Sequence, residues 1–130
     1  MCKLQKLTKL FANDCGLQSV PNLSELQELE VLGLANNSLT NLDESVLKLR
    51  NLRELHVHDC NLQSLPNLEH LQLLEYLNIS NNQVKRLDDS LGNLRNLKKL
   101  VANNCGLNNL PQLDQLQQLQ FLAVDDNDLG

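Results

Sequence analysis

One repeating pattern of apolar residues constrains the fold of this chain more than any other feature. The spacing Leu-x-x-Leu-x-Leu-x-x-(Asn or Cys)-x-Leu, with occasional Ala, Ile or Val in place of leucine, begins at Leu7, Leu29, Leu52, Leu74, Leu97 and Leu119. The steps between these starts alternate between 22 and 23 residues. A period of this length predicts a solenoid, in which each unit buries its apolar side against its neighbours rather than in one central core.

The ninth position of each unit alternates between two residue types, in the order Cys15, Asn37, Cys60, Asn82, Cys105 and Asn127. This position follows the apolar alternation, where the backbone turns and its polar groups need partners. An asparagine amide donates and accepts hydrogen bonds, whereas a thiol is a small apolar group with a weak donor. We therefore predict a structural role for all six residues. A zinc site is not expected, because the cysteine spacing fits no zinc cluster.

The Leu-x-Leu alternation in each unit predicts a short strand with one buried and one outward face. In the first unit, Leu10 and Ala12 should point inward, and Lys9, Phe11 and Asn13 outward. The segments that return to the next strand differ between the odd-numbered and the even-numbered units. Those of the 22-residue units contain Pro21, Pro66 and Pro111. Those of the 23-residue units contain Asp43 and Asp88, which we expect to cap short 3₁₀ or helical turns.

The pattern resembles the leucine-rich repeat superfamily from Leu4 to Leu129. The odd units resemble the 22-residue class of phosphatase regulators, and the even units the 23-residue class common in bacterial and signalling proteins. The alternation is also similar to ribonuclease inhibitors, but their repeats are longer and helical, so ribonuclease inhibition is not inferred. The resemblance implies an α/β solenoid: an arc with a parallel β-sheet on the concave face and short 3₁₀ or helical turns on the convex face. It also implies that the concave face binds proteins.

We predict one domain over residues 1–130, with six repeats starting at residues 7, 29, 52, 74, 97 and 119 and no recognisable caps. Terminal repeats normally need a polar outer face. The chain is therefore expected to be part of a longer array, an engineered block, or a molecule that covers its ends by self-association. Head-to-tail stacking would preserve the Cys/Asn alternation, because the first unit is Cys-type and the last is Asn-type. A monomer with frayed ends is the alternative.

The charge and the cysteines set the expected partners and compartment. A net charge of −5 argues against nucleic acid and anionic membranes, and no apolar run is long enough to span a bilayer. The start of the chain lacks the apolar stretch of a signal peptide. Strands lie about 4.8 Å apart, so cysteines two units apart are too distant for disulfides. We expect Cys15, Cys60 and Cys105 to be buried free thiols of a cytoplasmic protein.

The outward positions of the strands supply the candidate binding residues. All aromatics of the chain, Phe11, Tyr76 and Phe121, fall there, although the leucine core needs none of them. Exposed aromatics often mark partner contact; the alternative is that they shield neighbouring strand backbone. Small residues at 33 and 35 predict a shallow pocket beside Phe11. The predicted partner-binding residues are Phe11, Val31, Glu54, His56, His58, Tyr76, Asn78, Lys99, Val101, Phe121 and Asp125, with Glu54, Lys99 and Asp125 setting orientation.

His56 and His58 share a face of one strand, and three interpretations compete for them. A metal site would need a third ligand from Asp59 or a partner. A Ser80–His58–Asp59 catalytic arrangement would lack an oxyanion hole. A polar contact patch, pH-sensitive through histidine titration, is the interpretation we favour. We accordingly predict no catalytic residue, no metal, no cofactor and no enzymatic activity.

The leading functional hypothesis is a protein-recognition module that binds a partner of unknown identity on its concave sheet. The alternative is an engineered or excised repeat block whose main property is self-association through its uncapped ends. An enzyme is the third hypothesis, and it depends on the histidine pair alone.

Overall fold

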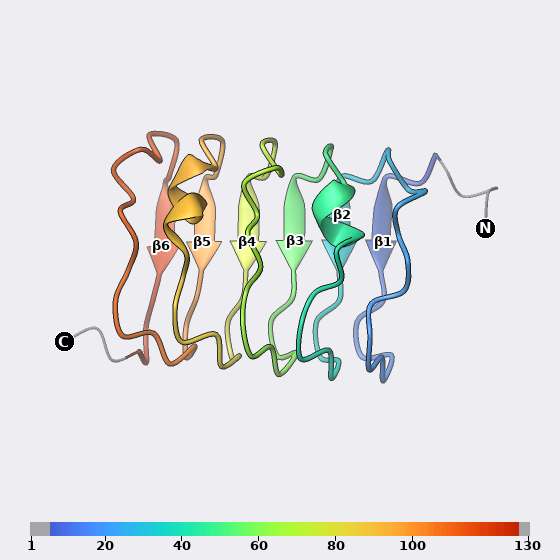
Figure 1. Ribbon diagram of the computed structural model, residues 1–130, viewed down its shortest axis with the longest axis horizontal. Helices are drawn as coiled ribbons and strands as arrows, with labels where there is room; N and C mark the ends of the chain where they lie inside the picture. The colour runs from blue at the N-terminus through green and yellow to red at the C-terminus, as the bar shows by residue number, and fades with distance from the viewer. Residues whose placement is uncertain (1–5, 128–130) are drawn as a thin grey trace.

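The computed structural model describes residues 6–127 and shows one parallel sheet backed by short return segments. The strands are β1 (Lys9–Phe11), β2 (Val31–Gly33), β3 (Glu54–His56), β4 (Tyr76–Asn78), β5 (Lys99–Val101) and β6 (Phe121–Ala123). They lie side by side in sequence order, with the return segments on one side of the sheet (Figure 1). The α/β solenoid predicted from the repeat is confirmed, one strand per unit. Leu4 and Leu129, where the repeat resemblance begins and ends, lie outside the described residues.

All six strands are aligned without any offset. The central leucines of neighbouring strands pair in the order Leu10, Leu32, Leu55, Leu77, Leu100 and Leu122. This alignment confirms the predicted inward and outward rows, because the flanking residues of each strand point to the opposite face. The inner leucines of the four central strands are fully buried. At the end of the stack Leu122 is 39% exposed, because no further unit covers it in the described structure.

A residue with a left-handed backbone ends the strand region of every unit. Its φ angle lies between 52° and 58° at Asp14, Asn36, Asp59, Asn81, Asn104 and Asp126. Asparagine and aspartate tolerate this conformation better than other residues that carry a Cβ. The eighth position of all six units is therefore Asn or Asp for a backbone reason. Asp59, considered above as a metal ligand or triad member, is one of these exposed turn residues.

The ninth-position asparagines hold the turns of adjacent units together. The Asn82 Oδ1 atom accepts the N–H groups of Cys60 and Leu62, at 3.0 and 2.9 Å. Its Nδ2 atom donates to the carbonyl oxygens of Val57, Ile79 and Ser80. Asn37 and Asn127 repeat this pattern one 45-residue period away. The predicted structural role of these amides is confirmed.

The ninth-position thiols point back to the preceding Asn-type unit. The Sγ atoms of Cys60 and Cys105 donate to the carbonyl oxygens of Leu34 and Ile79, each at 3.0 Å. Burial raises the pKa of both thiols. The expectation of burial is wrong for Cys15, which is exposed because no preceding unit covers it in the described structure. All three cysteines are free, as expected from their spacing.

The return segments of the odd-numbered and even-numbered units differ, as the sequence predicted. The 23-residue units contain the 3₁₀ helices η2 (Val46–Lys48) and η3 (Asp89–Asn93). The 22-residue units make single turns in which leucines three residues apart bond through their backbones, as from Leu71 to Leu68. The predicted capping is wrong for Asp88. It occupies the N-cap position of η3, but its carboxylate accepts a bond from the Ser90 hydroxyl at 2.6 Å instead of capping the backbone.

The carboxylate of Asp43 likewise does not cap η2 directly. Ser45 is the N-cap residue of that helix, and its N–H donates to Asp43 Oδ2 at 3.3 Å. Hydrogen bonds from Ser45 hold the pKa of the Asp43 carboxyl below its ordinary value. The two carboxylates therefore accept hydrogen bonds from a serine at the start of each 3₁₀ helix, Ser45 or Ser90, and do not cap the helix backbone.

The different burial of the cysteines leads to a prediction for their reactivity. We expect iodoacetamide to modify Cys15 in the folded protein about 100-fold faster than Cys60 or Cys105. Buried thiols with a raised pKa form little accessible thiolate, which is the species that reacts. Peptide mass mapping after timed alkylation gives the three rates separately. Adding urea should bring them to a common rate. Equal rates in the native protein would contradict the burial of Cys60 and Cys105.

Candidate functional site

The outward side of the strands, here called the sheet face, is the candidate site. It carries three rows of side chains that cross the six units. The first row contains Lys9, Val31, Glu54, Tyr76, Lys99 and Phe121, and the second contains Phe11, Gly33, His56, Asn78, Val101 and Ala123. The third row follows the strand ends at Asn13, Ala35, His58, Ser80, Asn103 and Asp125. These are the rows read from the sequence.

The middle of the sheet face holds a cluster around His56. The His56 Nε2 atom lies 3.1 Å from Glu54 Oε1, two residues away on the same strand. The imidazole packs on the Tyr76 ring of β4, with ring centroids 4.7 Å apart and an interplanar angle of 41°. Asn78 Nδ2 donates to the Tyr76 hydroxyl at 3.3 Å, which leaves the phenolic hydrogen for a ligand. Four predicted contact residues are therefore fixed in place by one another.

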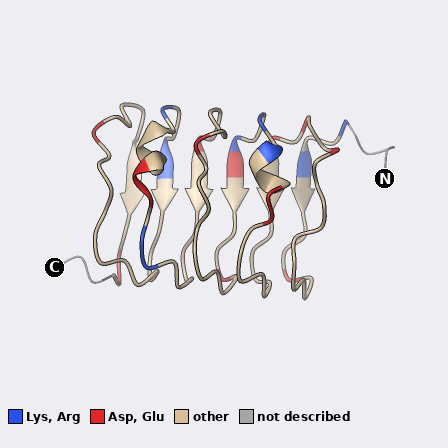
Figure 2. Ribbon diagram, viewed as in Figure 1, with Lys and Arg blue, Asp and Glu red and all other residues tan. Residues whose placement is uncertain are grey.

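A row of alternating charges borders this cluster at the start of the strands. Arg53 reaches Glu30 at 3.8 Å and Glu75 at 2.8 Å, and Lys98 reaches Glu75 at 3.7 Å. The row occupies the second position of the four central repeats, and this periodicity was the signal in the sequence that could have revealed it. Basic and acidic segments are accordingly interspersed along the solenoid (Figure 2). These charges neutralise one another. We therefore expect the row to restrict the orientation of a bound partner more than it attracts a charged one.

An open depression of about 340 Å³ lies beside the cluster. It is lined by Glu54, His56, Glu75, Tyr76, Lys98, Lys99 and Gln120. Lys99 forms no ion pair with any residue in the described range, in contrast to Lys98. The depression therefore combines an aromatic wall, a hydrogen-bond donor and an unpaired cation.

The shallow pocket predicted beside Phe11 is not open. A Cβ atom built on Gly33 would lie 2.6 Å from Phe11 Cδ1, so the phenyl ring itself covers the glycine. Val31, a predicted contact residue, is only 9% exposed and contributes little surface. In the register of the sheet it lies between Lys9 and Glu54. Small residues on β2 therefore give a place for the Phe11 ring instead of a pocket.

The remaining predicted contact residues lie around the central cluster. Phe11 and Phe121 are 60% and 50% exposed, at opposite ends of the sheet, so they do not form one aromatic patch with Tyr76. Val101 is half-buried on β5, and Asp125 is exposed just beyond β6. His58 meets His56 edge to face, with ring centroids 6.5 Å apart. Its Nδ1 atom is buried without a hydrogen-bond partner among the described residues.

Half of the third row, namely Asn13, Ser80 and Asn103, accepts backbone hydrogen bonds. The Asn13 and Asn103 Oδ1 atoms accept the N–H groups of the residues beside them in the row, each at 2.8 Å. Ser80 Oγ accepts the Asn103 N–H at 2.9 Å and is not bonded to His58. The serine is therefore not placed as a nucleophile activated by the histidine. Within residues 6–127, no group of three His, Cys, Asp or Glu side chains is arranged to hold a metal ion.

Comparison with known proteins agrees with this geometry. The family model described as leucine-rich repeats (2 copies) matches residues 50–95. The leucine-rich repeat domain of the type III effector XopL superimposes with a TM-score of 0.88 and 30% identity, over 96% of this chain and 46% of that one. The chain belongs to the leucine-rich repeat superfamily. No curated protein matches it in sequence.

Two further leucine-rich repeat structures extend the comparison. YopM from Yersinia enterocolitica has a TM-score of 0.82 and 37% identity, over 95% of this chain and 25% of that one. A plant peptide hormone receptor, RGFR1, in complex with RGF2, has a TM-score of 0.80 and 27% identity, over 95% of this chain and 21% of the receptor. The chain thus spans less than half of each of these leucine-rich repeat proteins. Leucine-rich repeat domains are generally non-enzymatic modules for protein interaction.

Among the described residues, none of the helices has the length and hydrophobicity of a membrane span.

Proposed function

We propose that the chain recognises a protein partner on its sheet face, with the centre of contact over β3, β4 and β5. The observation that carries this proposal is the His56–Glu54–Tyr76 cluster beside the open depression. Rings held by neighbouring groups lose little conformational entropy when a partner covers them, which favours tight contact. The partner remains to be identified, and no enzymatic step is part of the proposal.

The chemistry of the depression supports a partner with a mixed apolar and acidic contact group. The exposed sides of the Tyr76 and His56 rings offer apolar area, and tyrosine is enriched among residues that dominate binding energy. Lys99 stands beside Tyr76 on the next strand, so an acidic side chain of the partner can pair with its ammonium group. Phe121, one strand further, extends the apolar area toward the end of the sheet.

The variant Tyr76→Ala tests the proposal directly. We expect it to weaken binding about 10- to 100-fold, because it removes the aromatic wall and leaves the His56 ring without its stacking partner. The partner would be captured with the wild-type protein from a lysate and identified, and its affinity for each variant measured by titration calorimetry. Tyr76→Phe should separate the loss of the hydroxyl from the loss of the ring.

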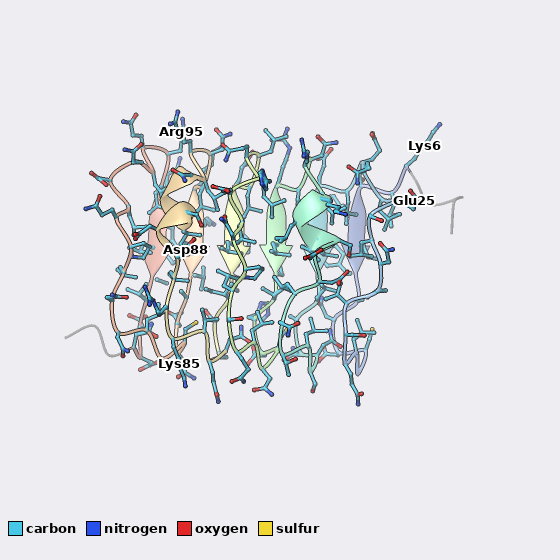
Figure 3. All side chains as sticks on the ribbon, viewed as in Figure 1. Lys6, Glu25, Lys85, Asp88 and Arg95 are labelled. Atoms are coloured by element: carbon cyan, nitrogen blue, oxygen red, sulfur yellow. The ribbon has the colours of Figure 1, made fainter. Side chains whose placement is uncertain are left out.

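Lys85→Ala is the matched control, because Lys85 is an exposed residue away from the sheet face (Figure 3). It should leave the affinity unchanged, and all three variants should keep the wild-type melting temperature within a few degrees. A partner that binds Tyr76→Ala as tightly as the wild-type protein would rule out the centre of the sheet face.

Self-association through the two ends of the stack is the second candidate function. The observation that favours it is the exposure of apolar groups on β6, where Phe121 is 50% and Leu122 39% exposed. The outer edges of β1 and β6 also have no strand partner among the described residues. Sedimentation velocity over a wide concentration range distinguishes the candidates, because end-to-end stacking produces species that grow with concentration.

We also propose a reducing, cytoplasmic location for the chain. The observation that supports it is that Cys15, Cys60 and Cys105 are free thiols. Expression of a fluorescent fusion, followed by fractionation, would test the location directly.

A further inference from the structure

The side of the solenoid opposite the sheet carries a polar groove between the return segments of the fourth and fifth units. Its main part measures about 630 Å³ and is lined by Asp89, Gly92, Asn93, Arg95, Leu110, Pro111, Gln112 and Gln115. A second part of about 320 Å³ is lined by Arg95, Asn96, Gln115, Gln117 and Gln118. The two parts share Arg95 and Gln115, so they lie next to each other. Arg95 lies at its edge, close to η3 (Figure 3).

A glycine of η3 lets the backbone of the fifth unit approach the helix closely at this groove. Gly92 occupies the place that Leu47 holds one 45-residue period earlier, where the leucine packs against the core. A Cβ atom on Gly92 would lie 2.7 Å from the carbonyl oxygen of Gln112. The backbone of the fifth unit therefore rests directly on η3 at this point. Polar side chains line the groove on both sides of that contact.

On the fifth-unit side of the groove, neutral amides stand where the first unit carries acids, whereas Asp89 of η3 is an acid on the opposite side. Gln115 and Gln118 occupy the places of Glu25 and Glu28 in the first unit. Arg95 consequently forms no ion pair with any residue among 6–127. The side-chain amides of Gln112, Gln115, Gln117 and Gln118 form no hydrogen bond within the same range. The groove thus holds the unpaired Arg95 guanidinium and the Asp89 carboxylate among amides whose donors and acceptors face solvent.

We propose that this groove binds an extended peptide segment whose acidic side chain pairs with Arg95. Each glutamine amide can donate to a peptide carbonyl and accept from a peptide N–H, and an extended strand presents both at regular intervals. A planar guanidinium matches a carboxylate through two parallel hydrogen bonds. The return segments of the fourth and fifth units run beside each other on this side of the sheet (Figure 1).

Sugars and nucleic acids fit the same lining less well. The groove is lined by no aromatic residue, so neither a sugar ring nor a base has a surface on which to stack. The groove shares no lining residue with the depression at Tyr76, so peptide binding here does not depend on partner binding on the sheet face.

The test is a titration of the isotope-labelled protein, followed by amide resonances, with the capped peptide acetyl-Ala-Val-Glu-Val-Ala-amide. We expect the resonances of Gly92, Gln112 and Gln115 to shift, with an affinity about three- to tenfold higher than for the same peptide with glutamine in the centre. Arg95→Gln should abolish this preference. Arg50→Gln, the equivalent change one 45-residue period earlier, should retain it.

Three results would overturn the proposal. One is the absence of shifts around the groove at millimolar peptide. Another is an equal loss of preference in Arg95→Gln and Arg50→Gln. The third is that acetate or glucuronate alone shifts the same resonances as strongly as the peptide, which would make the groove a simple anion or sugar site. Gln115→Ala serves as a second variant, because it removes an exposed amide without altering the backbone, and it should weaken both peptides equally.

Discussion

Replacing Asn82 by alanine is expected to lower the free energy of unfolding by about 3–5 kcal/mol, because the change leaves several buried backbone groups without partners. The side chain is 5% exposed, and its amide makes five hydrogen bonds that join two units. The two N–H groups that lose Oδ1 belong to Cys60 and Leu62, both of which are buried. A loss of this size is a large fraction of the stability of a small domain.

The variant Asn82→Cys tests why the two residue types alternate. A thiol can donate to one carbonyl, as the native cysteines do at Leu34 and Ile79, but it accepts the N–H groups of the preceding turn poorly. We therefore expect Asn82→Cys to be nearly as destabilising as Asn82→Ala. Asn109→Ala is the control, because Asn109 is exposed and its side chain makes no hydrogen bond among the described residues.

Urea unfolding followed by circular dichroism gives the free energies of these variants. The control should lie within about 0.5 kcal/mol of the wild-type protein. If Asn82→Cys matched the wild-type protein, the asparagine amides would not be the groups that hold the turns, and the alternation would need another explanation.

The fold could be predicted from the sequence because its strongest constraints are local and periodic. A 22/23-residue period places one strand in each unit, and alternation within Leu-x-Leu decides which side chains point inward. For the same reason the outward rows were predicted correctly, down to the neighbours of Tyr76 on β3 and β5. The recurrence of Asn or Asp at the eighth position was present in the same pattern, but neither it nor its backbone cause was recognised from the sequence.

The candidate site could be predicted less completely, because exposure and pairing depend on several units at once. Val31 points outward, yet it is only 9% exposed, and Phe11 covers Gly33 while its ring remains 60% exposed. The exposure of Cys15 depends on what precedes its unit, which the repeat pattern does not encode. The groove at Arg95 depends on a single departure from the repeat, Gly92 in place of a leucine, and on the backbone position that this glycine permits.

Stability should also depend strongly on position along the stack, and Leu77 and Leu122 allow a direct comparison. They occupy the same place in the repeat, at the centre of β4 and β6, but Leu77 is fully buried and Leu122 is 39% exposed. We expect Leu77→Ala to cost about 2–5 kcal/mol, because it removes buried methyl groups and leaves a cavity between two units. Leu122→Ala should cost about 1 kcal/mol or less, since only one unit packs against that side chain in the described structure.

The comparison can be made in one series of urea titrations, with hydrogen exchange to locate the effect. In a solenoid each unit contacts only its neighbours, so Leu122→Ala should speed exchange mainly in the last unit. Leu77→Ala should speed exchange in the units on both sides of β4, because it weakens two interfaces at once. Equal costs at the two positions would mean that Leu122 is covered in solution, and the end of the stack would then be an interface between molecules instead of a free surface.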